Sequence, residues 1–151
     1  MSKKNSSVNL KNGFKEFKDL SKIFSNFKSK LNSTNKKKFV VAVSGGPDSL
    51  ALAALSKAYT YCYKSKFYYV LINHNIRRNS LQEAKKVKIL LKKKQINLKI
   101  ISNKKKIEKN IQGEARKIRY ELLSNFCLKN NTRSLITCLL YTSPSPRDNR
   151  V

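Results

Sequence analysis

The chain has 151 residues, and its 34 lysines and arginines against 8 aspartates and glutamates give a formal net charge of +26. This length suits one domain and is too short for two full ones. So large a positive charge repels itself within a compact fold, and it favours anionic partners such as nucleic acid, nucleotide phosphates or anionic lipid. No apolar run reaches the roughly 18 residues that a transmembrane helix needs, so the sequence predicts no membrane-spanning segment.

Two features of the sequence bear on its cellular compartment. The polar N-terminus leads into no apolar signal core, which argues against secretion. The three cysteines, at positions 62, 127 and 138, form no CxxC pair, so a disulfide framework or a structural zinc site has no support. We therefore expect a cytoplasmic protein whose thiols are reduced.

The basic excess has two explanations that stay open. Lysine is far commoner than arginine, and asparagine and isoleucine are also abundant, as in genes with AT-rich codons. Selection for a polyanionic partner is the other explanation. Either cause yields an electropositive surface, because lysine meets phosphate as a point charge.

The first predicted element is an amphipathic helix that follows a polar stretch and begins near residue 14. Lysines occupy its other sides, so it is expected either to dock on the domain core or to contact a membrane or tRNA. Glu16, Asp19 and the lack of arginine count against a mitochondrial targeting segment. The helix is predicted from apolar residues at spacings of three and four: Phe14, Phe17, Leu20, Phe24, Phe27 and Leu31.

The rest of the sequence alternates predicted strands and helices. Strands are expected at residues 39–43, 67–72 and 98–101, with a fourth at 134–137. Helices are expected at 50–57, from 80 to about 94 and from 111 to about 128, the second opened by a Ser80–Glu83 capping box and the third by Asn110. This alternation predicts an α/β fold, an open parallel sheet with helices on both faces that is cut off after about the fourth strand.

Three segments follow from this reading: an N-terminal tail and helix at 1–35, a partial α/β domain at 36–137, and an anomalous tail at 138–151. The tail contains no lysine, and two of the chain's three prolines lie in its Ser-Pro-Ser-Pro run. It resembles the translation of a transposase-type sequencing adapter, which predicts a non-native end. A flexible Pro/Ser terminus is the alternative.

The most informative segment is the turn from Ser44 to Ser49, between the first predicted strand and a helix. Glycine lets the backbone turn sharply, and the N–H groups of the turn and the helix terminus then point at an anion. Pro47 suits the first helical turn. Asp48 is a carboxylate beside the expected phosphates, so it suggests a bridging Mg²⁺ ion. The loop has neither the Walker spacing nor the dinucleotide-binding pattern.

Ser44-Gly45-Gly46-x-Asp48-Ser49 after a strand resembles the PP-loop of ATP pyrophosphatases. That superfamily has a Rossmann-like fold and cleaves ATP between its α- and β-phosphates, leaving an adenylated intermediate. The resemblance implies that ATP and Mg²⁺ bind at Ser44, Gly45, Gly46, Pro47, Asp48 and Ser49, with Asp48 as the metal ligand.

Two further blocks resemble the tRNA(Ile)-lysidine synthetases within that superfamily. Residues 72–84 are similar to the D-H-G-L-R-x-x-S-x-x-E-A block, with matches at His74, Arg77, Ser80, Glu83 and Ala84, and residues 110–122 resemble the A-R-x-x-R-Y block. The likeness runs over about residues 14–137. It departs at Asn73, where the family often has Asp, and at Asn75, where it has Gly. The family's later H-H-x-x-D-D-Q-x-E-T block is absent.

The resemblance assigns roles to the residues of these blocks. Asp48, His74 and Arg77 are the expected catalytic residues, although a lone histidine is often only a packing residue. Arg116, Arg119 and Tyr120 share one side of a helix. This side is expected either to be a solvated face or to contact phosphate or tRNA.

The implied reaction joins free L-lysine to C2 of the wobble cytidine in isoleucine tRNA, through an adenylated intermediate. ATP is converted to AMP and pyrophosphate. The rivals are another PP-loop tRNA-modifying enzyme of the thiolase type, and a non-catalytic basic module that binds nucleic acid or a membrane surface. The chain as written is expected to be an inactive fragment with an exposed strand edge.

Overall fold

The computed structural model describes the backbone of residues 10–138 and the side chains of residues 18–138. The chain divides into two compact units, residues 1–36 and 37–151. The first contains helix α1 (Leu10–Ser33), longer than predicted, in which Leu20 and Ile23 are exposed. The docking predicted for this helix stays a prediction. None of the described helices is long and apolar enough to cross a membrane.

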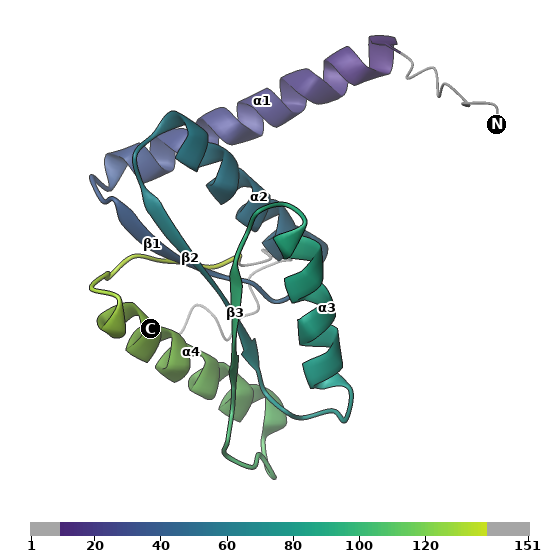
Figure 1. Ribbon diagram of the computed structural model, residues 1–151, viewed down its shortest axis with the longest axis vertical. Helices are drawn as coiled ribbons and strands as arrows, with labels where there is room; N and C mark the ends of the chain where they lie inside the picture. Colours follow the sequence, from purple (N-terminus) through teal and green to yellow (C-terminus); the bar gives the residue numbers. More distant parts are fainter. Residues whose placement is uncertain (1–9, 139–151) are drawn as a thin grey trace, which may run out of the picture. The chain divides into compact units, whose positions relative to one another are not determined.

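The second unit is built around a four-stranded parallel sheet, as Figure 1 shows. The strands are β1 (Lys38–Ala42), β2 (Lys66–Asn73), β3 (Leu98–Ser102) and β4 (Leu135–Ile136), in the order β3-β2-β1-β4. The helices between them are α2 (Pro47–Cys62), α3 (Ser80–Lys92) and α4 (Ile111–Lys129). The predicted α/β fold and every predicted element of this unit are confirmed.

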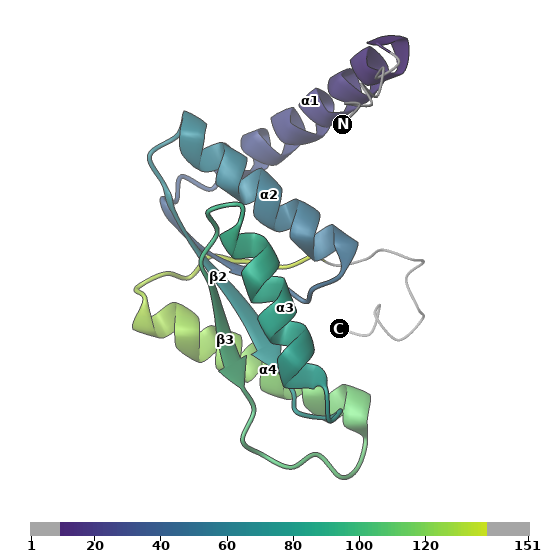
Figure 2. The ribbon, with the colours of Figure 1, turned by 45° about the vertical axis from the view of Figure 1, so that its right-hand side comes forward.

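Successive side chains of β1 enter two different cores, which is why helices cover both faces of the sheet. Val41 packs with Leu71 of β2 and with apolar residues of α2 and α3. Val40 packs on the opposite face with Val70 and with Leu123 of α4. Figure 2 shows α2 and α3 on one side of the strands and α4 on the other. Burial on both faces explains the continuous apolar run of β1.

The strand order reverses at β1, and this reversal locates the site. The chain runs from β1 to β2 to β3 in one direction, and α4 then carries it back across the opposite face to β4, beside β1. Parallel sheets of this kind leave a crevice at the carboxyl ends of the strands where the order reverses. The turn that follows β1 opens into this crevice.

The helix starts differ in detail from the predictions. The capping box predicted for Ser80 and Glu83 is wrong, because the cap of α3 is Asn79 and no side chain bonds to the exposed backbone N–H groups there. Asn110 is at the cap of α4 as predicted, but it adopts a left-handed conformation (φ 46°) and its side chain makes no capping bond. Ser80 and Glu83 therefore do not cap the helix with their side chains.

Tyr69 offers a test of the packing on the α2–α3 face. Its hydroxyl is buried without a hydrogen-bond partner, and burial raises the pKa of Tyr69 above its usual range. Removing an unpaired buried hydroxyl relieves its desolvation cost, so Tyr69→Phe is expected to raise the free energy of unfolding by about 1 kcal/mol. Urea denaturation measures this change. Tyr68→Phe, at a half-buried neighbour, is the control and should change stability less. A loss of stability in Tyr69→Phe would contradict the account.

Candidate functional site

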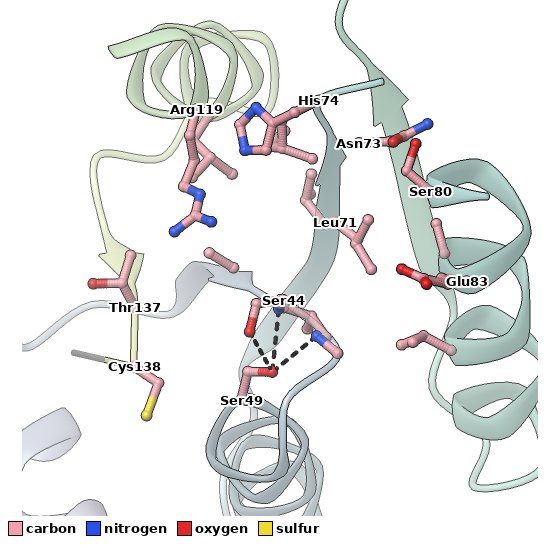
Figure 3. Close-up of a pocket in the computed structure, with 18 of the residues that line it drawn as sticks. Ser44, Ser49, Leu71, Asn73, His74, Ser80, Glu83, Arg119, Thr137 and Cys138 are labelled. Atoms are coloured by element: carbon pink, nitrogen blue, oxygen red, sulfur yellow. Dashed lines mark hydrogen bonds between the residues drawn. The ribbon is translucent and has the colours of Figure 1, made fainter. Parts of the chain in front are cut away.

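A cavity of about 510 Å³ opens at the carboxyl ends of the strands, where the strand order reverses. Its walls come from β1 and the turn after it, the end of β2, the start of α3, the middle of α4 and the residues after β4. Figure 3 shows side chains from these segments pointing toward one another across it. Segments far apart in the sequence therefore meet in one hollow, as a substrate site requires.

The turn between β1 and α2 has a conformation that requires glycine. Gly45 has φ of +93°, and a Cβ atom there would lie 3.0 Å from Cγ2 of Val87 in α3. Gly46 has an ordinary φ of −72° and caps α2 without any side-chain hydrogen bond. Pro47 occupies the first turn of the helix, as predicted. The turn can therefore bring its backbone close to α3 and to the cavity.

The hydroxyl of Ser49 holds this turn together. It accepts the N–H groups of Ser44 at 3.1 Å and Gly45 at 3.2 Å, and it donates to the carbonyl of Gly46 at 3.0 Å. The Ser44 hydroxyl lies 3.1 Å from it as well (Figure 3). Ser49 is buried, with 4% of its surface exposed. The structure thus places this predicted phosphate donor as the brace of the loop, with its hydrogen-bonding capacity used internally.

The predicted loop residues divide into two groups. Ser44, Gly45 and Ser49 line the cavity, whereas Gly46, Pro47 and Asp48 do not. Asp48 is exposed in the first turn of α2, where the backbone N–H groups have no acceptor within the helix. Those N–H groups and the helix dipole favour an anion at this end of α2.

The proposed metal ligation by Asp48 stays a prediction. Within residues 18–138, no group of three or more His, Cys, Asp or Glu side chains is arranged to hold a metal ion. Glu83 is the carboxylate that lines the cavity itself. Carboxylate oxygens suit Mg²⁺, and this ion usually keeps several waters and binds through one or two carboxylates and the substrate's phosphates. Asp48 at the start of α2 and Glu83 in the cavity wall are each of the residue type that this mode of binding uses.

His74 and Arg119 lie next to each other in the cavity wall (Figure 3). Nδ1 of His74 is buried and has no hydrogen-bond partner. Burial, and secondarily the positive charge of Arg119, lower the pKa of His74 below its usual range. A neutral imidazole with an unpaired nitrogen can exchange a hydrogen bond with a ligand in the cavity. The structure places the predicted His74 in the site, and it stays untested as a catalytic group.

The helix face predicted from Arg116, Arg119 and Tyr120 is divided between two roles. Arg119 and Tyr120 line the cavity, and Arg116 does not. The guanidinium of Arg116 lies 5.9 Å from the centroid of the Tyr120 ring, a cation–π distance. Arg119 therefore supplies positive charge inside the site, while Arg116 packs on the aromatic residue beside it.

The start of α3 contributes groups that the sequence prediction assigned elsewhere. Ser80 and Glu83, expected as a helix cap, both line the cavity. Arg77 lines it too, and its guanidinium lies 3.8 Å from the Glu83 carboxylate. Both side chains are more than half exposed, so this ion pair is weak and can rearrange when a ligand enters. The sequence did contain one indication that Glu83 belongs to the site, because Glu83 matches the family block at residues 72–84.

The two departures from the lysidine synthetase pattern form one hydrogen-bonded unit. Oδ1 of Asn73 accepts the backbone N–H of Asn75 at 3.1 Å, and its amide donates to Oδ1 of Asn75 at 2.8 Å. Asn75 donates in turn to the carbonyl of Asn103 at 2.9 Å. Asn75 has φ of 55°, a left-handed conformation that asparagine tolerates better than most residues. The pair thus fixes the turn between His74 and Arg77.

Comparison with known proteins agrees with this geometry. The sequence pattern of the PP-loop domain family matches residues 19–139. The chain belongs to the PP-loop domain family. This confirms the predicted family.

Several relatives of this PP-loop chain carry the name tRNA(Ile)-lysidine synthase. It is 40% identical over 103 residues to a tRNA(Ile)-lysidine synthase of Orientia tsutsugamushi, covering 66% of this chain and 23% of that protein. It is 38% identical over 99 residues to the protein of that name from Wolbachia pipientis, covering 64% and 23%. The chain therefore spans about a quarter of the length of these curated relatives.

A solved structure supports the fold. The U34-tRNA thiolase NcsA of Methanococcus maripaludis, a structure with a [4Fe-4S] cluster, superimposes with a TM-score of 0.59 at 19% identity. The match covers 66% of this chain and 37% of the thiolase. At this identity the likeness shows a shared PP-loop fold and nothing of the substrate.

The two glycines of the loop provide a matched test. Gly45→Ala forces an unfavourable φ and a close contact with Val87, so it is expected to lower the free energy of unfolding by about 1 to 3 kcal/mol. Gly46→Ala should cost less, because a Cβ there meets nothing closer than 3.7 Å. Urea denaturation of the two variants checks the difference. Equal losses would show that the turn does not need a left-handed residue.

His74 provides a test of the electrostatics, since it is the chain's single histidine. NMR titration is expected to give a pKa below the ordinary value of roughly 6.5. Arg119→Gln should raise that pKa part of the way, because burial remains; Arg116→Gln should leave it unchanged. Since folding lowers the pKa, the unfolded chain takes up the proton first. Stability is therefore expected to fall as the pH drops below about 6.5. A His74 pKa unmoved by Arg119→Gln would exclude the coupling.

Proposed function

We propose that the cavity binds ATP, with the triphosphate at the turn after β1, and that the protein takes part in forming lysidine in isoleucine tRNA. The observation that carries the proposal is the braced turn at Ser44–Ser49, which opens into a cavity where the strand order reverses. Membership of the PP-loop family and the shared name of the curated relatives support it.

The charges around the cavity suit a polyphosphate. The N–H groups at the start of α2 provide partial positive charge, and Arg119 adds a full positive charge from the α4 side. The guanidinium donates several hydrogen bonds in a fixed plane and keeps its charge at any physiological pH. Held in place before the reaction, these groups stabilise the negative charge that gathers on departing pyrophosphate.

The proposed reaction has two steps. The C2 carbonyl oxygen of the wobble cytidine attacks the α-phosphorus of ATP, and the bond to the β-phosphate breaks, releasing pyrophosphate. The amine of free lysine then adds to C2, and the oxygen leaves with AMP while the amine loses a proton. Activation is required because a carbonyl oxygen is a poor leaving group until it is adenylated. Mg²⁺, when bound by Asp48, Glu83 or both, would neutralise phosphate charge.

His74 suits a positioning role in this scheme. Its lowered pKa keeps the imidazole neutral near pH 7, so Nδ1 can accept or donate one hydrogen bond according to the tautomer. A neutral ring beside Arg119 also avoids a second positive charge competing for the same water and phosphate. The ring is therefore proposed to orient a substrate group at the end of β2.

The binding part of the proposal is tested with two arginines on one helix. Arg119→Gln is expected to weaken ATP binding by about tenfold or more, since a hydrogen bond to a charged group contributes roughly 1.5 to 3 kcal/mol. Arg116→Gln removes the same charge outside the cavity, so its effect should be small. Equilibrium binding of a fluorescent ATP analogue to the 151-residue chain measures both. Equal weakening would refute a direct role for Arg119.

The reaction is tested in a longer protein, because the chain spans only part of its relatives. A chimaera of the Orientia tsutsugamushi relative, with this chain replacing the part that it matches, should form AMP and pyrophosphate only with both isoleucine tRNA and free lysine. Asp48→Ala in the chimaera should reduce that turnover, and unchanged turnover would reject the role of Asp48. Transfer of sulfur instead of lysine would favour the thiolase alternative. RNA binding without ATP binding would favour a non-catalytic module.

A further inference from the structure

The loop between β3 and α4 concentrates positive charge at the carboxyl edge of the sheet, the edge on which the cavity opens. Its lysines are exposed, and among residues 104–109 only Glu108 is acidic. The loop at residues 104–109 lies between the two family blocks, at residues 72–84 and 110–122, and belongs to neither. Four of its six residues are lysines: Lys104, Lys105, Lys106 and Lys109.

The base of this loop is held firmly. Asn103 is buried, its side chain accepts the N–H of Lys105 at 2.9 Å, and its amide donates to the Lys105 carbonyl at 2.7 Å. Its backbone N–H donates to the carbonyl of Asn73, at the end of β2, at 2.8 Å. The loop therefore leaves the sheet in a fixed direction, which reduces the ordering cost of binding a partner.

The loop also lies at the correct edge of the sheet. It follows the carboxyl end of β3, and the phosphate-binding turn follows the carboxyl end of β1, two strands away. Neighbouring strands are about 4.8 Å apart, and the end of β3 pairs with Asn73 whereas the end of β1 pairs with Val70, so the two loops begin roughly 14 Å apart. Figure 2 shows the loop extending beyond the ends of β2 and β3.

We propose that Lys104, Lys105, Lys106 and Lys109 bind the sugar–phosphate backbone of the RNA beside the nucleotide that enters the cavity. The inference rests on the proposed function, in which a base of the RNA is the group modified. An enzyme that acts on a base takes it out of the stack into a pocket, so the backbone on either side must be held nearby. Lysines at this distance meet that need.

The loop's own carboxylates do not prevent this. Lys106 lies 3.3 Å from Glu108, and Lys105 lies 3.8 Å from Glu121 of α4. All four side chains are at least half exposed, so these ion pairs contribute little and can exchange for phosphate. The hollow between the loop and α4 has no acidic excess that would repel phosphate, because its lining has four lysines, Lys105, Lys106, Lys109 and Lys117, against three glutamates, Glu108, Glu114 and Glu121.

The composition of the loop favours RNA over an anionic membrane. Ile107 is the only apolar residue in 104–109, and it is half-buried. Peripheral membrane segments combine basic residues with exposed apolar groups that enter the lipid. The loop itself lacks such an anchor, the nearest exposed apolar side chain being Ile111 at the start of α4, and its charge fits a polyanion such as RNA.

The test compares two sets of four lysines in the full chain. One variant changes Lys104, Lys105, Lys106 and Lys109 to Gln. The control changes four exposed lysines at the opposite, amino edge of the sheet: Lys37, Lys38, Lys64 and Lys66. Both lower the net charge equally. Binding of an isoleucine tRNA anticodon stem-loop is measured by filter retention across a salt series, with circular dichroism confirming folding.

The loop variant is expected to lose about tenfold or more in RNA affinity, and the slope of log affinity against log salt should fall by up to about three. The control variant should keep most of the RNA affinity and most of the salt dependence. Equal losses in the two variants, no RNA binding by the parent chain, or an effect seen only with phosphatidylserine vesicles would each overturn the proposal. ATP binding is measured in parallel. If the chain binds RNA through the loop but does not bind ATP, the proposed function is rejected while the RNA-binding surface is still supported.

Discussion

The site depends on one buried hydroxyl. Ser49 satisfies two backbone N–H groups and one carbonyl of the turn after β1, so the turn keeps its shape without a ligand. An unbraced glycine-rich turn would have to be ordered by the anion that it binds, at a cost in affinity. The remaining N–H groups at the start of α2 are then already positioned for an anion before it binds. Preorganised dipoles of this kind are what phosphate chemistry needs most.

Much of the fold followed from local sequence patterns. The apolar run before Ser44 predicted a buried strand, and the alternation of strands with helices predicted a parallel sheet covered on both faces. The glycine-rich turn between β1 and α2 was predicted as well, and the structure has it in that place. The strand order was not predicted. It depends on how α4 crosses the sheet to place β4 beside β1, which no local pattern encodes.

The side-chain assignments around the site were less predictable. Arg116 and Arg119 are equivalent by spacing, yet only Arg119 enters the cavity, because the rotation of α4 is set by its packing on Val70 and Val40. Ser80 and Glu83 match a capping box by residue type, but the backbone at Asn79 makes the actual cap. Local patterns specify which residues share a helix face. Tertiary packing decides what that face meets.

The asparagines at 73 and 75 show how two positions can depart from a family pattern together. The amide of Asn73 donates to Asn75, so an aspartate at 73 would set one oxygen against another. A glycine at 75 would remove that acceptor and leave the amide with the 3.3 Å contact to Ser102. The effects of changing Asn73 and Asn75 are therefore expected to be coupled through this hydrogen bond, a case of intramolecular epistasis. Scoring the two positions separately would treat as independent two residues that share one hydrogen bond.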